Sequence, residues 1–223
     1  MNYGSELRSM DDVAEAIGAL GFLPFFRNTV PGFSIEERTP RALWFSDQPG
    51  PWDWKGPLIR TGDFVYGKFF RGKAVFVSRE WLPDLANFRR DGYDYDARCE
   101  DGLAPWHEQR IYEKLSCGGM LSKALKNDCG YGKEGLKGFD QAITHLQMQT
   151  YVCVENFEYA LDRHGAPYGW GIARYNTPEV LYGRAFVRSA YRRDPAESYE
   201  RIKAHLLSVL PATEAEVKKL LRP

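Results

Sequence analysis

A change of hydrophobic period at Thr150 limits how this chain can fold more than any other feature. Before it, apolar side chains recur at helical spacing, and one stripe contains Phe139, Ala142, Ile143 and Leu146. After it, residues 151–154 are rich in β-branched and aromatic side chains and can pair with residues 168–175 across a loop that contains glycine and proline. The pattern predicts a helix over residues 137–149 that leads directly into a two-stranded hairpin over residues 152–175.

A second helix is predicted just before this one. The turn Gly118-Gly119 is followed by residues 120–126, whose apolar side chains have helical spacing, and Gly130 suits the end of that helix. A turn rich in glycine and lysine continues to Gly138. Helix, turn, helix and hairpin is the plan of a winged helix, a module that most often binds nucleic acid by laying its second helix in a groove. Winged helices also dock proteins, so the plan alone leaves the function open.

Length and composition place the chain among folded globular proteins. Its 223 residues can bury one substantial core or two small ones, and a hydrophobic fraction of 43% argues against disorder. No apolar run approaches the roughly 18 residues that a membrane span needs, and the first 20 residues lack the basic start and apolar core of a signal peptide. We therefore expect a cytoplasmic protein with no membrane contact.

Metal and cofactor chemistry has little support in the sequence. The cysteines form no Cys-x-x-Cys pair and no two histidines have zinc spacing, so free buried thiols are favoured over a metal or redox site. The acidic residues 91–101 lack the spacing of a calcium loop and are predicted to form a solvated loop. A small-molecule enzyme using the aspartates of residues 84–101 would lack a nucleophile, a metal set and a glycine-rich phosphate loop. We expect no metal and no other cofactor.

The charges are segregated along the chain although the formal net charge is zero. Residues 55–90 carry eight basic and three acidic side chains, residues 91–101 carry five acidic side chains and one arginine, and residues 184–203 are positive by three. A neutral total argues against a strongly basic nucleic-acid binder. The segregation still permits a basic face if the basic segments meet in space.

Local signals outline the rest of the chain. Ser9 is predicted to cap a first helix, Arg71-Gly72 to turn a hairpin over residues 64–78, and the proline-rich residues 49–57 to form a loop. Further helices are predicted to start at Ser34, Ser78, Pro105, Thr177, Pro195 and Thr213. The predicted class is α+β, mostly helical with two β-hairpins and winged-helix character. We expect one compact unit with an N-terminal α/β lobe, residues 1–103, and a winged-helix lobe that includes the C-terminal helices, residues 104–223.

The run Gln147-Met148-Gln149 carries the chemistry that this sequence offers. In a helix, residues i and i+2 point to different sides, whereas in an extended stretch they share one face. If the chain is extended here, two amides point together, and each can accept and donate a hydrogen bond. Glutamine has no proton equilibrium near neutral pH, but it can orient a water and stabilise positive charge with its carbonyl dipole. The alternative is the end of a helix with two exposed amides.

This run, at the end of a helix that enters a hairpin, resembles the Gln-x-Gln or Gln-x-Asp motif of the AlkZ/YcaQ family of DNA glycosylases. The chain resembles more specifically a set of short bacterial proteins labelled AlkZ-related. That resemblance spans most of the chain and is carried by Leu23-Pro24, Gly50-Pro51-Trp52, Tyr66-Gly67-Lys68-Phe69-Phe70, Phe88-Arg89-Arg90-Asp91-Gly92-Tyr93, residues 146–151 and Tyr168-Gly169-Trp170-Gly171.

The resemblance implies tandem winged helices and metal-independent excision of bulky N-alkylated purines or unhooking of interstrand crosslinks. Gln147 and Gln149 would then position the water and stabilise an oxocarbenium-like sugar. Basic side chains would hold DNA phosphates, and those predicted to do so are Lys123, Lys126, Lys133, Lys137, Arg89, Arg90 and Arg174. In the active glycosylases the motif lies near the start of a longer chain, and a further domain completes the DNA cleft.

A non-catalytic DNA-binding or protein-docking module is therefore the rival hypothesis. The geometry of Gln147 and Gln149 separates the two. Side chains that converge on a cleft beside a basic wall favour an enzyme, and divergent side chains favour a module. The sequence leaves the oligomeric state open.

Overall fold

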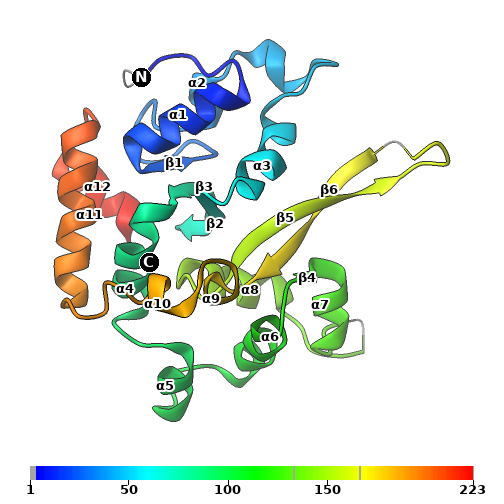
Figure 1. Cartoon of the computed structure of the whole chain (residues 1–223), viewed down its shortest axis with the longest axis vertical. Helices are drawn as coiled ribbons and strands as arrows, with labels where there is room; N and C mark the ends of the chain where they lie inside the picture. The colour runs from blue at the N-terminus through cyan, green and yellow to red at the C-terminus, as the bar shows by residue number, and fades with distance from the viewer. Residues whose placement is uncertain (1–3, 133, 166, 223) are drawn as a thin grey trace.

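The computed structural model describes residues 4–132, 134–165 and 167–222, which form helices packed around one antiparallel sheet (Figure 1). Within these residues the sheet has six strands in the order β1-β3-β2-β5-β6-β4. The strands are β1 Phe22–Pro24, β2 Phe64–Phe70, β3 Lys73–Ser78, β4 Met120–Leu121, β5 Cys153–Leu161 and β6 Pro167–Asn176. The predicted α+β class is thus confirmed as a mixed fold of helices and an antiparallel sheet.

Two pairs of consecutive strands form the middle of the sheet. β2 and β3 pair around Arg71-Gly72, and both residues have positive φ (53° and 70°). A two-residue hairpin turn needs this conformation in order to match the twist of its strands. β5 and β6 pair from Cys153 opposite Asn176 to Leu161 opposite Pro167, and they project from the body of the molecule (Figure 1). β2 joins β5 through Tyr66 opposite Val154, so both pairs belong to the same sheet.

The helices begin where capping residues allow. Ser9 and Thr213 each form a reciprocal capping box, and Ser34, Asp94 and Thr177 accept a backbone N–H at a helix start. The helices before the β2–β3 pair are α1 Met10–Leu20, α2 Ile35–Arg38, the 3₁₀ turn η1 Arg41–Trp44 and α3 Pro51–Arg60. Those between β3 and β5 are η2 Arg79–Trp81, α4 Leu82–Arg90, α5 Tyr95–Glu100, α6 Trp106–Ser116, α7 Ser122–Asp128 and α8 Phe139–Met148. After β6 follow α9 Pro178–Tyr182, α10 Arg184–Val187, α11 Pro195–Val209 and α12 Glu214–Leu221.

Two predicted loops are wrong. Residues 49–57 contain most of α3, because Pro51 takes the first helical position, where its missing N–H is not needed, and Asp53 accepts the Gly50 N–H at 2.9 Å. The acidic residues 91–101 contain α5, because Asp94 caps it by accepting the Ala97 N–H at 2.9 Å.

The apolar side chains form two clusters. The larger one joins α1, the β1–β3 part of the sheet and the C-terminal helices, whose contributions include Ile202, Leu206 and Val217. The smaller one joins α5 to α8, with Ile111, Leu125, Phe139, Ile143 and Leu146 among its members. The division into residues 1–103 and 104–223 remains a prediction. Among the described residues no helix is both long and apolar enough to cross a membrane.

Candidate functional site

The end of α8 determines where the two glutamines point. Gln149 has φ −81° and ψ 1°, and Thr150 follows in the left-handed region at φ 63°. The Thr150 N–H donates to the Gln147 carbonyl at 2.8 Å, and the Tyr151 N–H donates to the Leu146 carbonyl at 2.9 Å, which closes the last turn. The chain is therefore not extended at Gln147-Met148-Gln149, and the two glutamine side chains do not share a face.

Gln147 holds α8 against β2. Its side chain is 1% exposed, its Oε1 accepts the Lys68 N–H at 3.1 Å, and its Nε2 donates to the Ile143 carbonyl at 3.1 Å. The pairing of β2 with β5 is limited to Tyr66 opposite Val154. Two residues beyond that pair, the Gln147 amide oxygen accepts the Lys68 N–H in place of a carbonyl from a neighbouring strand.

Gln149 lies on another side of α8, toward α6. Its Nε2 lies 3.3 Å from His145 Nε2, and His145 Nδ1 lies 2.7 Å from Glu108 Oε1. The hydrogen bond with Glu108 raises the pKa of His145, while burial acts in the opposite direction. Gln149 Oε1 is buried and has no hydrogen-bond partner among the described residues. The structure thus places a carboxylate, an imidazole and an amide in a row, and the two glutamines diverge.

A cavity of about 800 Å³ lies in front of α8. It is lined by side chains of α8 together with Lys68 of β2, the start of α6 and Lys137. Lys68 Nζ donates to Thr144 Oγ1 at 3.2 Å, and Lys137 Nζ donates to the Gly132 carbonyl at 2.8 Å. Glu108 and Asp140 also line it, so the cavity offers both donors and acceptors.

The lysines that were predicted to bind phosphate have different positions. Lys123 and Lys126 are exposed on α7, and Lys126 Nζ lies 5.9 Å from the centre of the Phe139 ring. Lys137 is exposed at the cavity in front of α8. Lys133 lies outside the described residues. The structure thus brings one of these lysines, Lys137, next to α8.

The predicted arginines are largely engaged inside the protein. Arg90 is fully buried, forms an ion pair with Glu179 at 2.5 Å and donates from Nη2 to the Thr150 carbonyl at 2.7 Å. The phosphate role expected for Arg90 is corrected accordingly, because its guanidinium has no exposed surface. Arg174 donates to Glu158 Oε1 at 2.6 Å and to the Gly119 carbonyl at 2.7 Å, which ties β6 to the start of β4.

Arg89 is partly buried and pairs with no carboxylate among the described residues. Its Nη2 donates to the Phe69 carbonyl at 3.1 Å, and its Nε and Nη1 are buried without a partner among the described residues. Burial lowers the pKa of Arg89 to about 10. A partly buried positive charge with no carboxylate partner in the described part of the chain therefore lies next to β2, with its guanidinium carbon 4.9 Å from the centre of the Phe88 ring.

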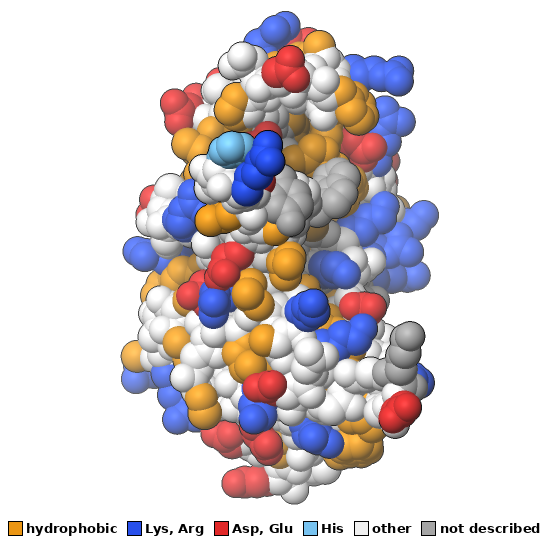
Figure 2. All heavy atoms as spheres, turned by 90° about the vertical axis from the view of Figure 1, so that its right-hand side faces the viewer, with side chains coloured by type: hydrophobic (Ala, Val, Ile, Leu, Met, Phe, Trp, Pro, Cys, Tyr) orange, Lys and Arg blue, Asp and Glu red, His pale blue; other side chains and the backbone are white. Residues whose placement is uncertain are grey.

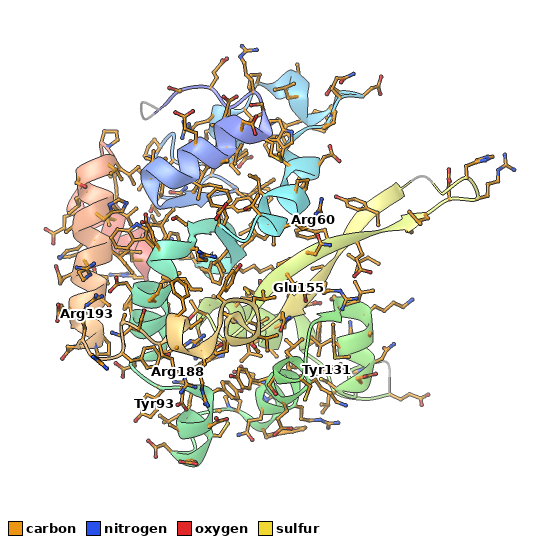
Figure 3. All side chains as sticks on the ribbon, viewed as in Figure 1. Arg60, Tyr93, Tyr131, Glu155, Arg188 and Arg193 are labelled. Carbon is orange, nitrogen blue, oxygen red and sulfur yellow. The ribbon has the colours of Figure 1, made fainter. Side chains whose placement is uncertain are left out.

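Basic and acidic segments that are far apart in the sequence form ion pairs with each other in the structure. The C-terminal arginines pair with acids of residues 91–101 and with Asp84, and Arg188 and Arg193 lie on that side of the molecule, near Tyr93 and along α11 (Figure 3). The pairs are Arg184 with Asp96 at 3.2 Å, Arg188 with Asp94 at 2.7 Å and Arg193 with Asp84 at 2.5 Å. Lys68, Arg71 and Lys73 of the other basic segment form no ion pair within the described part of the chain.

The sequence did not identify several residues of this region. Glu108 and His145 are 37 positions apart, and Lys68 lies inside a predicted strand, so no local spacing connects them.

Lys and Arg side chains gather at the right-hand edge of the face in Figure 2. Within the described residues no group of three or more His, Cys, Asp and Glu side chains is arranged to hold a metal ion.

Two comparisons with known proteins find a match over nearly all of this chain. A family model described as AlkZ related matches residues 7–222. No curated protein matches the chain. A solved structure that matches is Streptomyces sahachiroi DNA glycosylase AlkZ, with 12% sequence identity and a TM-score of 0.47. The match covers 97% of this chain and 59% of the glycosylase chain, so this chain spans less than two thirds of that protein.

Proposed function

The chain belongs to the AlkZ-related family, and we propose that it binds DNA through a winged-helix unit formed by residues 106–176. The order of elements supports the unit: α6, β4, α7, α8, β5 and β6 follow one another, and β4 returns to pair with β6. The smaller apolar cluster draws on all three of these helices. In this arrangement α8 is the second helix of the helix-turn-helix pair and is the one expected to contact nucleic acid.

The cavity in front of α8 is the observation that carries the proposal. Side chains of α8 that can form hydrogen bonds, such as Gln141 and Thr144, lie there between Lys68 and Lys137. The lysines can neutralise phosphates and fix the position of the strand, while the helix side chains contact base edges. Glu108, which lies 2.7 Å from His145 Nδ1, and Asp140 also line this cavity, so the phosphate contacts are assigned to Lys68 and Lys137 alone.

The salt dependence of DNA affinity tests this role. Fluorescence anisotropy with a labelled duplex should show affinity that falls steeply with salt, and Lys68→Gln and Lys137→Gln should each lower the log–log slope by about one. Arg8→Gln removes an exposed cation outside the cavity and serves as the matched control. The variant Lys123→Gln, Lys126→Gln measures whether bound DNA extends over α7. Slopes equal to wild type in both cavity variants contradict the α8 contact, and binding that is absent at low salt favours a protein-docking module.

A second candidate function is hydrolysis of an N-glycosidic bond beside this cavity, which Glu108 and His145 line and which Gln149 adjoins through its contact with His145. The observation that favours it is the row of Glu108, His145 and Gln149, in which Gln149 Oε1 lacks a partner within the described residues. Glu108 can orient the imidazole, His145 can take a proton from water, and an amide carbonyl can stabilise an oxocarbenium-like sugar. Gln147 would contribute by holding α8 in place.

A glycosylase assay on duplex DNA with a bulky N7-alkylguanine tests this second function. If Gln149 stabilises the transition state, Gln149→Ala should lower excision on the order of 10²-fold, because one such group is typically worth about 3 kcal/mol. Gln147→Ala and the double variant show whether the two amides act as a unit, in which case the double loss is little larger than either single loss. No excision by wild type rejects the enzymatic function and leaves DNA binding to be judged separately.

A further inference from the structure

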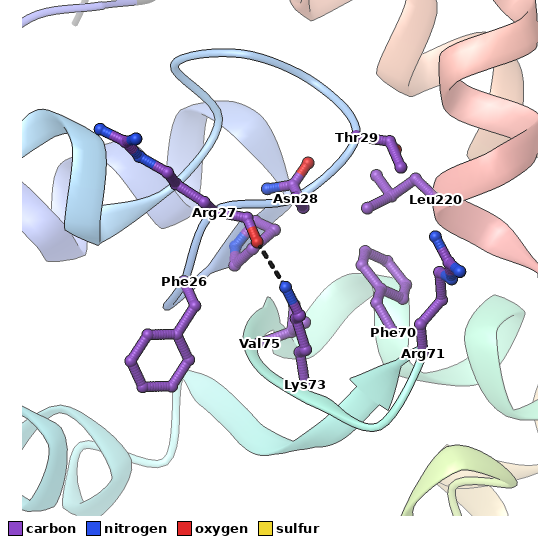
Figure 4. A pocket seen from close by; sticks show the side chains of 10 residues that line it. Phe26, Arg27, Asn28, Thr29, Phe70, Arg71, Lys73, Val75 and Leu220 are labelled. Atoms are coloured by element: carbon purple, nitrogen blue, oxygen red, sulfur yellow. Dashed lines mark hydrogen bonds between the residues drawn. The ribbon is translucent and has the colours of Figure 1, made fainter.

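A second cavity, of about 480 Å³, lies at the β2–β3 turn (Figure 4). It is bounded by residues 24–29, by the turn and by Leu220 of α12. Phe26, Phe70 and Val75 supply apolar surface, and Arg27, Arg71 and Lys73 supply positive charge. Among the described residues, its lining includes no Asp or Glu. The composition suits a ligand that has an apolar ring and a negative charge.

The aromatic side chains of this cavity are held in place by their neighbours. The Phe70 ring stacks on Phe22 with ring centres 5.7 Å apart, and the Phe26 ring packs edge-on against Phe25 at 5.1 Å. Phe70 and Val75 are buried and form the floor, while Phe26 is partly exposed and lies on the other side of Lys73 from Phe70 in Figure 4. A ligand would therefore meet a surface that is already ordered, which lowers the entropy cost of binding.

The cations of this cavity have unused bonding capacity. Lys73 Nζ donates to the Arg27 carbonyl at 2.8 Å, the bond drawn in Figure 4, and an ammonium has three donors. Arg71 forms no hydrogen bond or ion pair within the described residues. The Arg27 guanidinium points away from Lys73 in Figure 4 and lies 3.9 Å from Glu37, so we assign it no ligand contact.

Arg89 adds an independent indication of a negative ligand. Its guanidinium carbon lies 5.9 Å from the centre of the Phe70 ring, and its buried Nε and Nη1 lack partners among the described residues. A buried charge is costly unless an opposite charge or hydrogen bonds compensate it. A phosphate in the adjoining cavity would supply part of that compensation.

The backbone of the turn points the same way. Arg71 has φ 53°, at the first position of a turn where asparagine, aspartate and glycine are preferred. An arginine in this conformation is an unfavourable local choice, and such choices cluster at functional sites. Here it places a guanidinium at the edge of the cavity.

We propose that this cavity binds a nucleotide, with its phosphate on Arg71 and Lys73 and its base against the floor formed by Phe70 and Val75. Cations beside aromatic rings are the combination that proteins use for nucleotides without sequence preference. Within the described part of the chain, the lining of this cavity shares no residue with that of the cavity in front of α8, although the turn also reaches α8: a Cβ on Gly72 would lie 3.4 Å from Thr144 and 3.8 Å from Met148. The nucleotide can be free or part of a single strand.

Isothermal titration with deoxyadenosine monophosphate tests the proposal, with deoxyadenosine and inorganic phosphate as partial ligands. We expect saturable binding of the monophosphate and at least tenfold weaker binding of each partial ligand. The variant Arg71→Asn, Lys73→Gln should weaken binding of the monophosphate at least tenfold, and Arg8→Gln should not change it. Asn suits the positive φ, so urea unfolding should show that the variant is as stable as wild type. Absence of saturable binding, or equal binding by the folded variant, overturns the proposal.

A short single-stranded oligonucleotide identifies the source of the nucleotide. Competition with the monophosphate, lost in Arg71→Asn, assigns the site to a strand, and binding of the monophosphate without competition assigns it to a free nucleotide. The variant Lys68→Gln, Lys137→Gln separates this site from the proposed DNA surface, since it should retain binding of the monophosphate. If wild type binds the monophosphate but no duplex, the DNA surface fails and the nucleotide site stands.

Discussion

Gln147 and Gln149 should differ sharply in what they contribute to stability, although they are identical residues two positions apart. Gln147→Leu leaves the Lys68 N–H without its acceptor at a partly buried position, which costs about 1–3 kcal/mol. The Ile143 carbonyl lies inside α8, where the helical backbone bond satisfies it, so the loss of the Nε2 donor adds less. We expect a net destabilisation of about 2 kcal/mol.

Gln149→Leu should be close to neutral. It removes a buried Oε1 that has no partner within the described residues, and it gives up only the 3.3 Å contact with His145. Replacing an unsatisfied polar atom by an apolar group is nearly neutral or stabilising. We expect a change in unfolding free energy within about 0.5 kcal/mol.

Urea unfolding followed by tryptophan fluorescence measures both changes, since the chain has six tryptophans. A loss of about 2 kcal/mol lowers the urea midpoint by about 1 M at unchanged slope. The double variant should equal the sum of the single changes, because the two amides share no hydrogen bond within the described residues. Equal costs for the two variants, or a strongly non-additive double variant, would refute the reasoning and restore the idea of one shared site.

Three further predictions concern the titration of His145, the pH dependence of DNA affinity and the ion pair of Arg90 with Glu179. Glu108 raises the pKa of His145, so protonation of His145 should stabilise the fold fully below its unfolded pKa of about 6.5. This stabilisation should be lost as pH rises through the folded pKa. An NMR titration should show the raised pKa in wild type and a lower one in Glu108→Gln. DNA affinity should weaken over the same pH range. Glu179→Gln should destabilise the protein by about 3 kcal/mol in the same urea experiment, because it leaves the buried Arg90 without its counter-ion. The control Glu100→Gln, at an exposed position, should change the unfolding free energy by less than about 0.5 kcal/mol.

Local signals in the sequence were enough to place several elements. Ser9 and Thr213 start helices through capping boxes, and Arg71-Gly72 turns a pair of strands. These features depend on bonds between residues at most a few positions apart, so the sequence displays them directly.

The two loops that were predicted wrongly show where local signals mislead. In α3, Pro57 is an unfavourable interior residue, yet Trp54 and Leu58 are 6% and 1% exposed, so their burial outweighs the local preference. In α5, Asp94 belongs to a run that is typical of a loop, but an aspartate is also a good helix cap. Composition cannot distinguish the two roles without knowledge of what packs nearby.

The directions of the two glutamines could not be predicted for a different reason. The change of period locates the end of the helix, but the side chains diverge because the helical turn continues through Gln149 and the chain leaves it only at Thr150, which adopts a left-handed conformation. This is uncommon for a β-branched residue. Arg90 holds it there through bonds from Nε to Thr150 Oγ1 at 3.1 Å and from Nη2 to the Thr150 carbonyl at 2.7 Å. The decisive contact thus spans 60 positions in the sequence.

The same long-range pairing explains how a chain with zero net charge can present a basic face. The acids of residues 84–101 accept bonds from the arginines of residues 184–203, and Glu179 neutralises Arg90 in the interior. Those acids are therefore not available to neutralise Lys68, Arg71 and Lys73, which remain without ion pairs among the described residues. The adjacent arginines Arg89 and Arg90, which look like the strongest phosphate ligands in the sequence, contribute instead to the interior. Arg71 and Lys73 are exposed beside the β2–β3 turn, where the proposed nucleotide would supply the counter-charge that no carboxylate among the described residues supplies.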